Sequence, residues 1–598
     1  MKKVLWYLNR IRFMSFFEII HRFKEIAYRQ LFKSNFIRKN LSSSFVFINN
    51  AKFRDLFVSL PLEKKNKLIE RAEGIIEGKF DFLGIDIDLN NYESLEVNDL
   101  WFYDFIHNKK HTHQTATNKI NYKNRDDICD MKFIWEVHRL YIVQDLSVAY
   151  FLTGNEKFLK NATTYVKSWL SNNKVNFGPG WNSGIEISIR SVSLLIFLSL
   201  CEKKIEKKLL AKVFNCLEYS RLYLNLFPSL FSSANNHLVA EIVGKLAIES
   251  FTDYDQLKTK KLFCDLDNEI SKQILCDGVP AEQSPTYGAF TLEFYWLAHH
   301  LFGKNISDKN NIANFKNFIF NIRQGSKTAS IGDDDEGYVL SINRSTDYAA
   351  EICNLFGTEK KKSSIKTFEE GGYSVVHNQG WDIIFDHGPL GYLSICAHGH
   401  SDALSLLMSY NHKNVLIDAG TYLYHGGGNI RNKYRSTAMH NTLNINNESQ
   451  SRISGHFNWS KKANSFLVAS KAMEDDWFFV AQQNGYKKKF KVTHERKLSM
   501  QNKSIFVEDR FLEDIDVTSN INWLLSPEVI IEKHTDFLIL IIEGGQKIKV
   551  EFPNSGTINI NKTYFSPSFN KQVSTTQISW TGQVGSTYIS TKFTPIYE

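Results

Sequence analysis

The apolar residues of this 598-residue chain follow two different periods, and the change occurs once, near residues 355–370. From Trp101 to about Asn343 they recur at i, i+3 and i+4, with short Gly, Asn or Pro breaks and no strand-like runs between segments. This pattern predicts helix after helix, arranged as an array of helical hairpins. The clearest predicted helices are Ile134–Leu152, Phe158–Leu170, Glu186–Leu200, Leu209–Leu226 and Leu238–Ser250.

An alternation of period two begins after Gly371-Gly372 and continues, with Asn, Gly and Asp turn signals, to the end of the chain. Such alternation predicts a sandwich of antiparallel sheets. The predicted organisation is a helical domain, residues 101–355, followed by an antiparallel β-sandwich domain, residues 370–598. Residues 41–100 are expected to form an irregular lead-in with one strand-like run, Phe80–Leu89.

Positive charge is concentrated at the beginning of the chain. Residues 1–40 hold ten Lys and Arg against Glu18 and Glu25, which accounts for the whole net charge of +8. The neutral remainder argues against a nucleic-acid-binding protein. Apolar residues recur at helical spacing among the basic ones, so we expect a basic amphipathic helical arm. Such an arm can contact a membrane surface or a polyanion, or it can pack on the body with its basic face in water.

The seven cysteines are scattered and form no CxxC pair, which fits a reducing compartment. The apolar stretch Val4–Leu8 is too short for a signal peptide, so none is expected. The longest apolar run, Val192–Cys201, is too short to span a bilayer. These features favour a cytoplasmic or peripheral-membrane protein.

Two polar segments in the helical half carry residues able to do chemistry. Asn236 and His237 follow a Ser-Ser-Ala-Asn run and open a predicted helix, whose first turn favours an anion and a neutral imidazole. Tyr287 follows a Pro-initiated turn and can act as acid or base. The alternative is structural: a polar helix cap and a tyrosine at the edge of the core.

Two further segments lie in the β half. His398 and His400 precede a predicted strand, Asp418 ends the next one, and His440 lies beside another β-run. His400 and Asp418 are expected on neighbouring strands, where with His440 they make a three-ligand zinc set with an open fourth position. The alternative is a group of satisfied polar residues and a solvated histidine.

Together with Trp135–Arg139, Gly180–Ser183 and Ile331–Asp335, these segments resemble, in order and content, the heparinase II/III-type polysaccharide lyases, which include alginate and heparan-sulfate lyases. The resemblance implies an N-terminal (α/α) toroid followed by a C-terminal antiparallel β-sandwich. It also implies cleavage of a uronic-acid-containing polysaccharide by β-elimination at the 4-O-linked uronate. Members of the family that act on external polymers imply a periplasmic setting.

The resemblance also implies a role for each residue. Asn236 and His237 neutralise the substrate carboxylate, Tyr287 is the catalytic tyrosine, and His398 is the active-site histidine. The zinc ligands are His400, Asp418 and His440, and they bind one structural zinc ion. The residues expected to contact substrate are Arg435, Glu282, Trp181 and Tyr434, with Tyr424 as the alternative to Tyr434.

The chemistry requires these groups because the C5 proton becomes acidic only when the charge on the uronate carboxylate is offset. Either His398 or Tyr287 is then the base, and Tyr287 is the better placed acid. An alginate-like polymer or bacterial exopolysaccharide is favoured over heparin. The alternatives are a glycoside hydrolase that uses Asp333 with Glu282, and a non-catalytic glycan-binding protein of surface-polysaccharide assembly.

Overall fold

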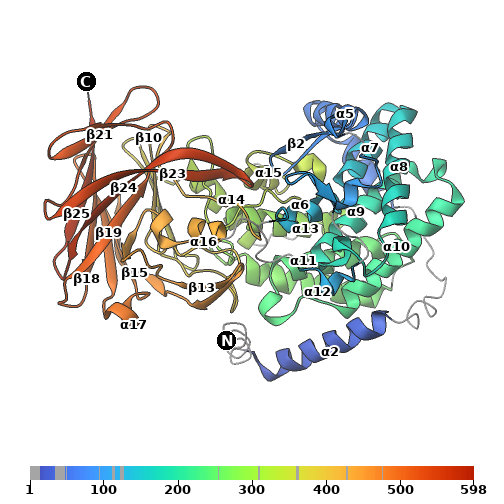
Figure 1. Ribbon diagram of the computed structural model, residues 1–598, viewed down its shortest axis with the longest axis horizontal. Coiled ribbons are helices and arrows are strands. Elements are labelled where there is room, and N and C mark those ends of the chain that lie inside the picture. Colours follow the sequence, from blue (N-terminus) through green and yellow to red (C-terminus); the bar gives the residue numbers. More distant parts are fainter. Residues whose placement is uncertain are drawn as a thin grey trace.

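A computed structural model shows two domains side by side, one helical and one built of sheets (Figure 1). The helical domain ends with α15 (Tyr348–Asn354), and the sheets begin with β7 (Ile365–Phe368). The boundary therefore lies where the apolar period changes. The structure describes residues 14–33, 48, 50–92, 95–110, 115–121, 127–253, 255–306, 310–357, 363–425, 429–474 and 476–597.

The helices of the first domain alternate between an inner and an outer layer. The inner helices are α5 (Leu62–Ile76), α7 (Tyr141–Thr153), α9 (Gly184–Cys201), α11 (Asn236–Glu249), α13 (Pro285–Leu301) and α15. The outer helices are α8 (Glu156–Asn172), α10 (Lys207–Leu226), α12 (Gln256–Gln273) and α14 (Asn310–Asn321). Each inner helix packs against the next inner helix along the chain, and the outer helices cover them. This is the (α/α) toroid that was expected.

The most apolar helix lies at the centre of the toroid. The segment Gly184–Lys204 is long and apolar enough to cross a membrane by length and composition, but its most apolar 18-residue window is wholly buried within the protein. Every residue of α9 is buried. A helix that is apolar on all sides is the expected core of a domain of this size.

Two helices lie in the region that was expected to be irregular. In α4 (Lys52–Val58) Phe53 and Phe57 are buried, and in α5 Leu68, Ala72 and Ile75 pack into the toroid core. The prediction of irregular structure was wrong because lysines and glutamates outnumber the few apolar residues that form this narrow stripe. The expected strand-like run is a hairpin of β1 (Lys79–Phe82) and β2 (Ile85–Asp88).

The expected helix Ile134–Leu152 is divided into α6 (Met131–Val137) and α7. The break falls at Leu140, which adopts a left-handed backbone conformation with φ of 61°. The break directs the buried side chain of Arg139 toward Glu186 in α9, with Nε 2.6 Å from Oε2. The helix is therefore interrupted at the point where Arg139 forms a buried ion pair with Glu186.

The second domain consists of antiparallel sheets around a separate hydrophobic core. Its five-stranded sheet has the order β11-β10-β9-β8-β7, and one face packs against the toroid through Phe368 and Tyr373 beside Phe318. The other strands of this sheet are β8 (Tyr373–Asn378), β9 (Trp381–Asp386), β10 (Leu406–Tyr410) and β11 (Lys413–Leu416).

Two further sheets complete the sandwich. The eight-stranded sheet has the order β15-β16-β17-β18-β25-β22-β21-β20, and the four-stranded sheet has the order β12-β19-β24-β23. Their strands are β12 (Leu443–Ile445), β15 (Ser465–Met473), β16 (Asp476–Gln483), β17 (His494–Gln501), β18 (Ser504–Phe511), β19 (Val517–Leu524), β20 (Ile530–Lys533), β21 (Phe537–Ile541), β22 (Lys547–Glu551), β23 (Gly556–Ser568), β24 (Lys571–Val584) and β25 (Ile589–Ile596).

The long hairpin of β23 and β24 reaches from the sandwich to the toroid (Figure 1). At its tip Phe569 is buried against Phe133 and Leu83 of the helical domain. The two domains thus share a packed apolar contact beside the candidate site.

Candidate active site

The two domains bring an asparagine, a tyrosine and a histidine together at their junction. Asn236 is the first residue of α11, and the side chain of Asn235 caps this helix by accepting from the His237 backbone N–H. Tyr287 lies in the first turn of α13, which Ser284 caps and Pro285 begins. Both side chains are fixed because helix caps set the direction of the first turn.

His398 reaches the same point from the loop between β9 and β10 of the sandwich domain. Its imidazole stacks on the Tyr287 ring with centroids 3.6 Å apart, and the Tyr287 hydroxyl lies 2.9 Å from the Tyr424 hydroxyl. Tyr287 and His398 expose only 6% and 5% of their surface. Both side chains are therefore almost completely covered by neighbouring residues in this structure.

Burial raises the pKa of Tyr287 well above its usual value, and the negative charges of Asp335 and Asp333 add to the effect. The phenol consequently keeps its proton at neutral pH and is available as an acid. Of the two tyrosines considered for substrate contact, Tyr434 and Tyr424, it is Tyr424 that lies beside Tyr287.

Glu282 holds the asparagine in place. Its carboxylate accepts from Asn235 Nδ2 at 3.0 Å and from Asn236 Nδ2 at 2.8 Å, as well as from the Asn236 backbone N–H. Asn236 Nδ2 also lies 3.4 Å from His398 Nε2, and its Oδ1 is buried with no hydrogen-bond partner among the described residues. Burial and the nearby His398 lower the pKa of His237 to about 4, so its imidazole is neutral at pH 7.

Asp333 connects this group to the sandwich. Its carboxylate lies 3.1 Å from His398 Nδ1 and 3.0 Å from His400 Nε2, and it accepts two hydrogen bonds from Arg431. Burial opposes ionisation, but the Arg431 charge and the histidine hydrogen bonds outweigh it and hold the pKa of Asp333 well below its usual range. Gly332 permits the close approach, since a Cβ there would lie 2.4 Å from the Gln283 carbonyl oxygen at a φ of +62°.

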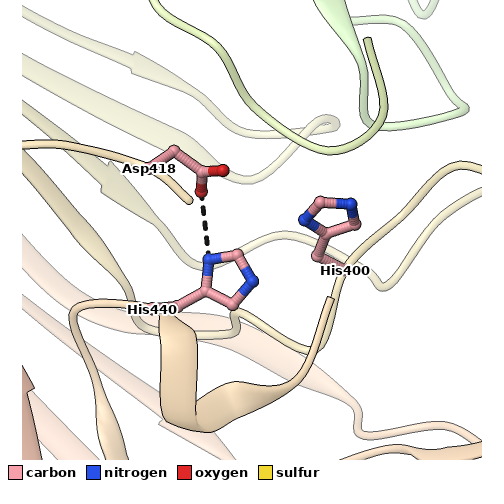
Figure 2. Close-up of side chains that lie close together, drawn as sticks. All are labelled: His400, Asp418 and His440. Carbon is pink, nitrogen blue, oxygen red and sulfur yellow. Dashed lines mark hydrogen bonds and ion pairs between the residues drawn. The ribbon is translucent and has the colours of Figure 1, made fainter. Parts of the chain in front are cut away.

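The three expected zinc ligands, His400, Asp418 and His440, lie together in the sandwich domain (Figure 2). One ligand atom from each lies within 4.8 Å of the others, and all three residues are buried. His440 Nδ1 is 3.0 Å from Asp418 Oδ2, whereas His400 Nδ1 and His440 Nε2 have no hydrogen-bond partner among the described residues.

None of these three residues lies within a strand. His400 precedes β10, Asp418 follows β11, and His440 follows the short 3-10 turn η8 (Thr437–Met439). The expected placement of His400 on a strand beside Asp418 was therefore wrong, although β10 and β11 do pair. The three side chains instead converge from loops that follow or precede these elements.

Three residues expected to contact substrate lie outside the site. Arg435 is completely buried and donates to the His456 and Gly455 carbonyl oxygens. Tyr434 is buried and its hydroxyl accepts from Gln572 Nε2 at 2.7 Å. Trp181 is buried in the toroid core, where the Arg190 guanidinium lies 4.8 Å from its ring centroid.

Several site residues had no assigned role from sequence. Arg431 lies on α16 (Ile430–Tyr434), and its guanidinium is 4.7 Å from the centroid of the Tyr424 ring. The sequence assigns Asp333 a role only in the hydrolase alternative, although it belongs to the Ile331–Asp335 segment. The acidic run at residues 333–335 was the available signal, because adjacent buried carboxylates require nearby cations. A buried charged group beside the site consists of Lys132, Glu136, Arg139, Glu186 and Asp335.

A helical toroid joined to an antiparallel β-sandwich is the architecture of toroid-type polysaccharide lyases. The chain belongs to the heparinase II/III family of these lyases. The family model of the heparinase II/III N-terminus matches residues 43–322, and that of the heparinase II/III-like C-terminal region matches residues 360–594.

Known proteins are similar to this chain over most of its length. A heparin-sulfate lyase of Pedobacter heparinus is 20% identical over 480 residues, which are 72% of this chain and 68% of the relative. A crystal structure of heparinase III superposes with a TM-score of 0.66 at 17% identity, covering 90% of this chain and 92% of the other. A heparan sulfate lyase mutant from Pedobacter heparinus gives 0.58 at 17% identity, covering 91% and 87%. These structural likenesses confirm the fold.

Proposed function

We propose that this protein cleaves a uronate-containing polysaccharide by β-elimination, in which the C5 proton is removed and the 4-O-linked sugar is expelled. The stacked pair of Tyr287 and His398, 3.6 Å apart, carries the proposal. An acid and a base on adjoining rings can reach the C5 proton and the leaving oxygen of a single sugar.

The hydrogen bonds favour His398 as the base. Asp333 is ionised and accepts from Nδ1 of His398, so Nε2 carries the lone pair that can take the C5 proton. Tyr287 keeps its proton and can deliver it to the leaving oxygen, with Tyr424 as its hydrogen-bond partner. The C4–O4 bond then breaks as the C4–C5 double bond forms.

The negative charge that develops on the uronate carboxylate in the enolate-like transition state must also be stabilised. The neutral imidazole of His237 and the amide of Asn236 lie at the N-terminus of α11, where the helix dipole favours negative charge. Each preorganised donor in such a site contributes on the order of 3 kcal/mol to transition-state stabilisation. Glu282 contributes by fixing the Asn236 amide beside His398.

The charges at the site favour a polymer that carries carboxylates without dense sulfation, such as an alginate-like chain or a bacterial exopolysaccharide. The buried cations nearest the reacting pair are already paired with protein carboxylates: Arg431 with Asp333, and Lys132 with Asp335. Apart from residues 1–40 the sequence has no net charge. A densely sulfated polymer is better matched by unpaired surface cations.

We further propose that His400, Asp418 and His440 bind one zinc ion. The two buried ring nitrogens that lack partners among the described residues, with the Asp418 carboxylate, are a suitable donor set for zinc. Asp333 accepts from His400 Nε2, which leaves the His400 Nδ1 lone pair free for a metal. Metal-binding histidines commonly donate their other ring N–H to a carboxylate in this way. When bound, the ion supplies a structural link among three loops.

The hydrolase alternative is weaker. It needs a carboxylic acid with a raised pKa, but Arg431 and two histidines hold the pKa of Asp333 low.

The deciding experiment is a screen of purified protein against alginate, unsulfated uronans and heparin. A lyase gives a rise in ultraviolet absorbance from the new double bond. New reducing ends without absorbance indicate a hydrolase, and binding without either product indicates a glycan-binding protein.

A further inference from the structure

Helix α2 (Phe16–Lys33) packs on the toroid through its polar side. The Glu18 carboxylate accepts from the Ser232 hydroxyl at 2.8 Å, and the His21 ring lies 5.6 Å from the Phe231 ring. Arg29 extends over the Phe227 ring at 5.0 Å. The inward surface of the helix is therefore formed by charged and polar residues.

Ion pairs within α2 neutralise this inward surface. Arg22 and Arg29 pair with Glu25 at 3.1 Å and 2.7 Å, and Arg22 also lies 3.6 Å from Glu18. These two arginines are only partly exposed. The cations on the inner side of α2 are thus engaged with neighbouring carboxylates.

The apolar side of the same helix faces outward. Phe16, Phe17, Phe23 and Ile26 expose 71%, 72%, 68% and 58% of their surface. The helix lies along the outside of the helical domain (Figure 1). A surface helix normally buries its apolar stripe and solvates its polar one, and α2 is reversed. A contiguous aromatic stripe of this kind marks a surface that another apolar phase covers.

We propose that α2 docks on an anionic lipid membrane, with Phe16, Phe17, Phe23 and Ile26 inserted at the level of the headgroups. Charge identifies this occupant: residues 1–40 carry the whole net charge of +8, and the remainder of the chain is neutral. An apolar stripe within a basic segment matches an anionic bilayer surface. A second copy of the chain would instead bring a second +8 segment against the first.

The contact surface of α2 links this docking to the candidate site. Phe231 and Ser232 belong to the 3-10 turn η6 (Phe231–Ser233), which leads directly to Asn236. A docked α2 thus holds this turn next to the bilayer. If the proposed lyase function is correct, this arrangement suits a glycan that is attached to a membrane.

The test is co-sedimentation of the full chain with phosphatidylcholine vesicles, with and without phosphatidylglycerol. We expect binding to the anionic vesicles, weakened by salt because part of the attraction is electrostatic. The double variant Phe17→Ser/Phe23→Ser should bind the anionic vesicles at least about tenfold more weakly than the wild type, because it removes two exposed phenyl groups. The matched control is Leu257→Ser/Ile530→Ser, which changes residues that expose 81% and 62% of their surface outside α2. It should bind like the wild type.

Failure of the wild type to bind anionic vesicles overturns the proposal, as does an equal loss in the control variant. A wild-type dimer that the Phe17→Ser/Phe23→Ser variant dissociates, without any lipid binding, identifies a second copy as the occupant and also overturns it. The assay needs no glycan, so its result is independent of the lyase proposal. Cleavage of a soluble polymer should be unchanged in the double variant.

Discussion

His398 Nδ1 lies 3.1 Å from Asp333 Oδ2, and the other oxygen of that carboxylate lies 3.0 Å from His400 Nε2. One buried carboxylate thus orients both the proposed base and a proposed metal ligand. It can do so because Arg431 compensates its charge from the opposite side. Asp333 therefore links the proposed reacting pair directly to the loops of the proposed metal site.

Substitution Asp333→Asn tests this relationship. The neutral amide can no longer fix the His398 tautomer, and in a related histidine–carboxylate pair such a change costs on the order of 10⁴ in turnover. Arg431 also loses its partner in a buried site, which should lower the free energy of unfolding by about 3–5 kcal/mol. Turnover in the ultraviolet assay and urea unfolding measure the two effects.

The matched control for Asp333→Asn is Asp334→Asn. Its carboxylate accepts from Thr286 rather than from a histidine, with Oδ2 2.8 Å from Oγ1. This variant should retain most of the activity. Wild-type turnover in Asp333→Asn would show that His398 needs no carboxylate partner.

Substitution Tyr287→Phe tests the proposed acid. Loss of the hydroxyl removes the proton donor and the hydrogen bond to Tyr424, so turnover should fall about 10²–10⁴-fold while the fold is retained. Tyr434→Phe is the control, because the Tyr434 hydroxyl contacts Gln572 outside the site. Equal activity in both variants would remove Tyr287 from the mechanism.

The sequence predicts the two-domain fold well because apolar periodicity is a local property that helices and strands impose directly. Helix caps and an initial proline likewise place Asn236 and Tyr287 correctly, since these signals act within one turn. His398 follows from the combined motif rather than from spacing. These predictions depend on few contacts between residues distant in the chain.

Other parts of the site depend on contacts that the sequence does not contain. Arg431 and Arg435 are four residues apart in the sequence. Arg431 belongs to the site because it forms an ion pair with Asp333, which is 98 positions away in the chain. Tyr424 and Tyr434 differ in the same way, because one faces Tyr287 and the other Gln572. Long-range packing, rather than local pattern, decided which residue of each pair belongs to the site.

The buried Glu241 should make stability depend on pH. Burial raises its pKa to about 7, against hydrogen bonds from Ser229 that favour the ionised form. The folded protein then holds a proton that the unfolded chain releases near pH 4.5, so this group lowers stability as pH rises from 4.5 to 7. The size of the effect is roughly 3 kcal/mol.

Substitution Glu241→Gln should remove this decline. In urea unfolding, the variant should be more stable than the wild type at pH 8 and similar to it at pH 5. Glu218→Gln, which alters a partly exposed ion pair with Arg221, should leave the pH profile parallel to that of the wild type. A decline that persists in Glu241→Gln would assign it to another group.

The proposed metal site predicts one zinc ion per chain in protein purified without chelators. His440→Ala should lose the zinc and lower the melting temperature, because a structural ion stabilises the loops it joins. The control His412→Ala changes a largely exposed histidine paired with Asp382, and it should keep both the metal and the stability. Elemental analysis and thermal unfolding, before and after chelation, provide the readouts. Metal-free wild-type protein whose melting temperature is insensitive to added zinc would show that the buried nitrogens of His400 and His440 serve another purpose.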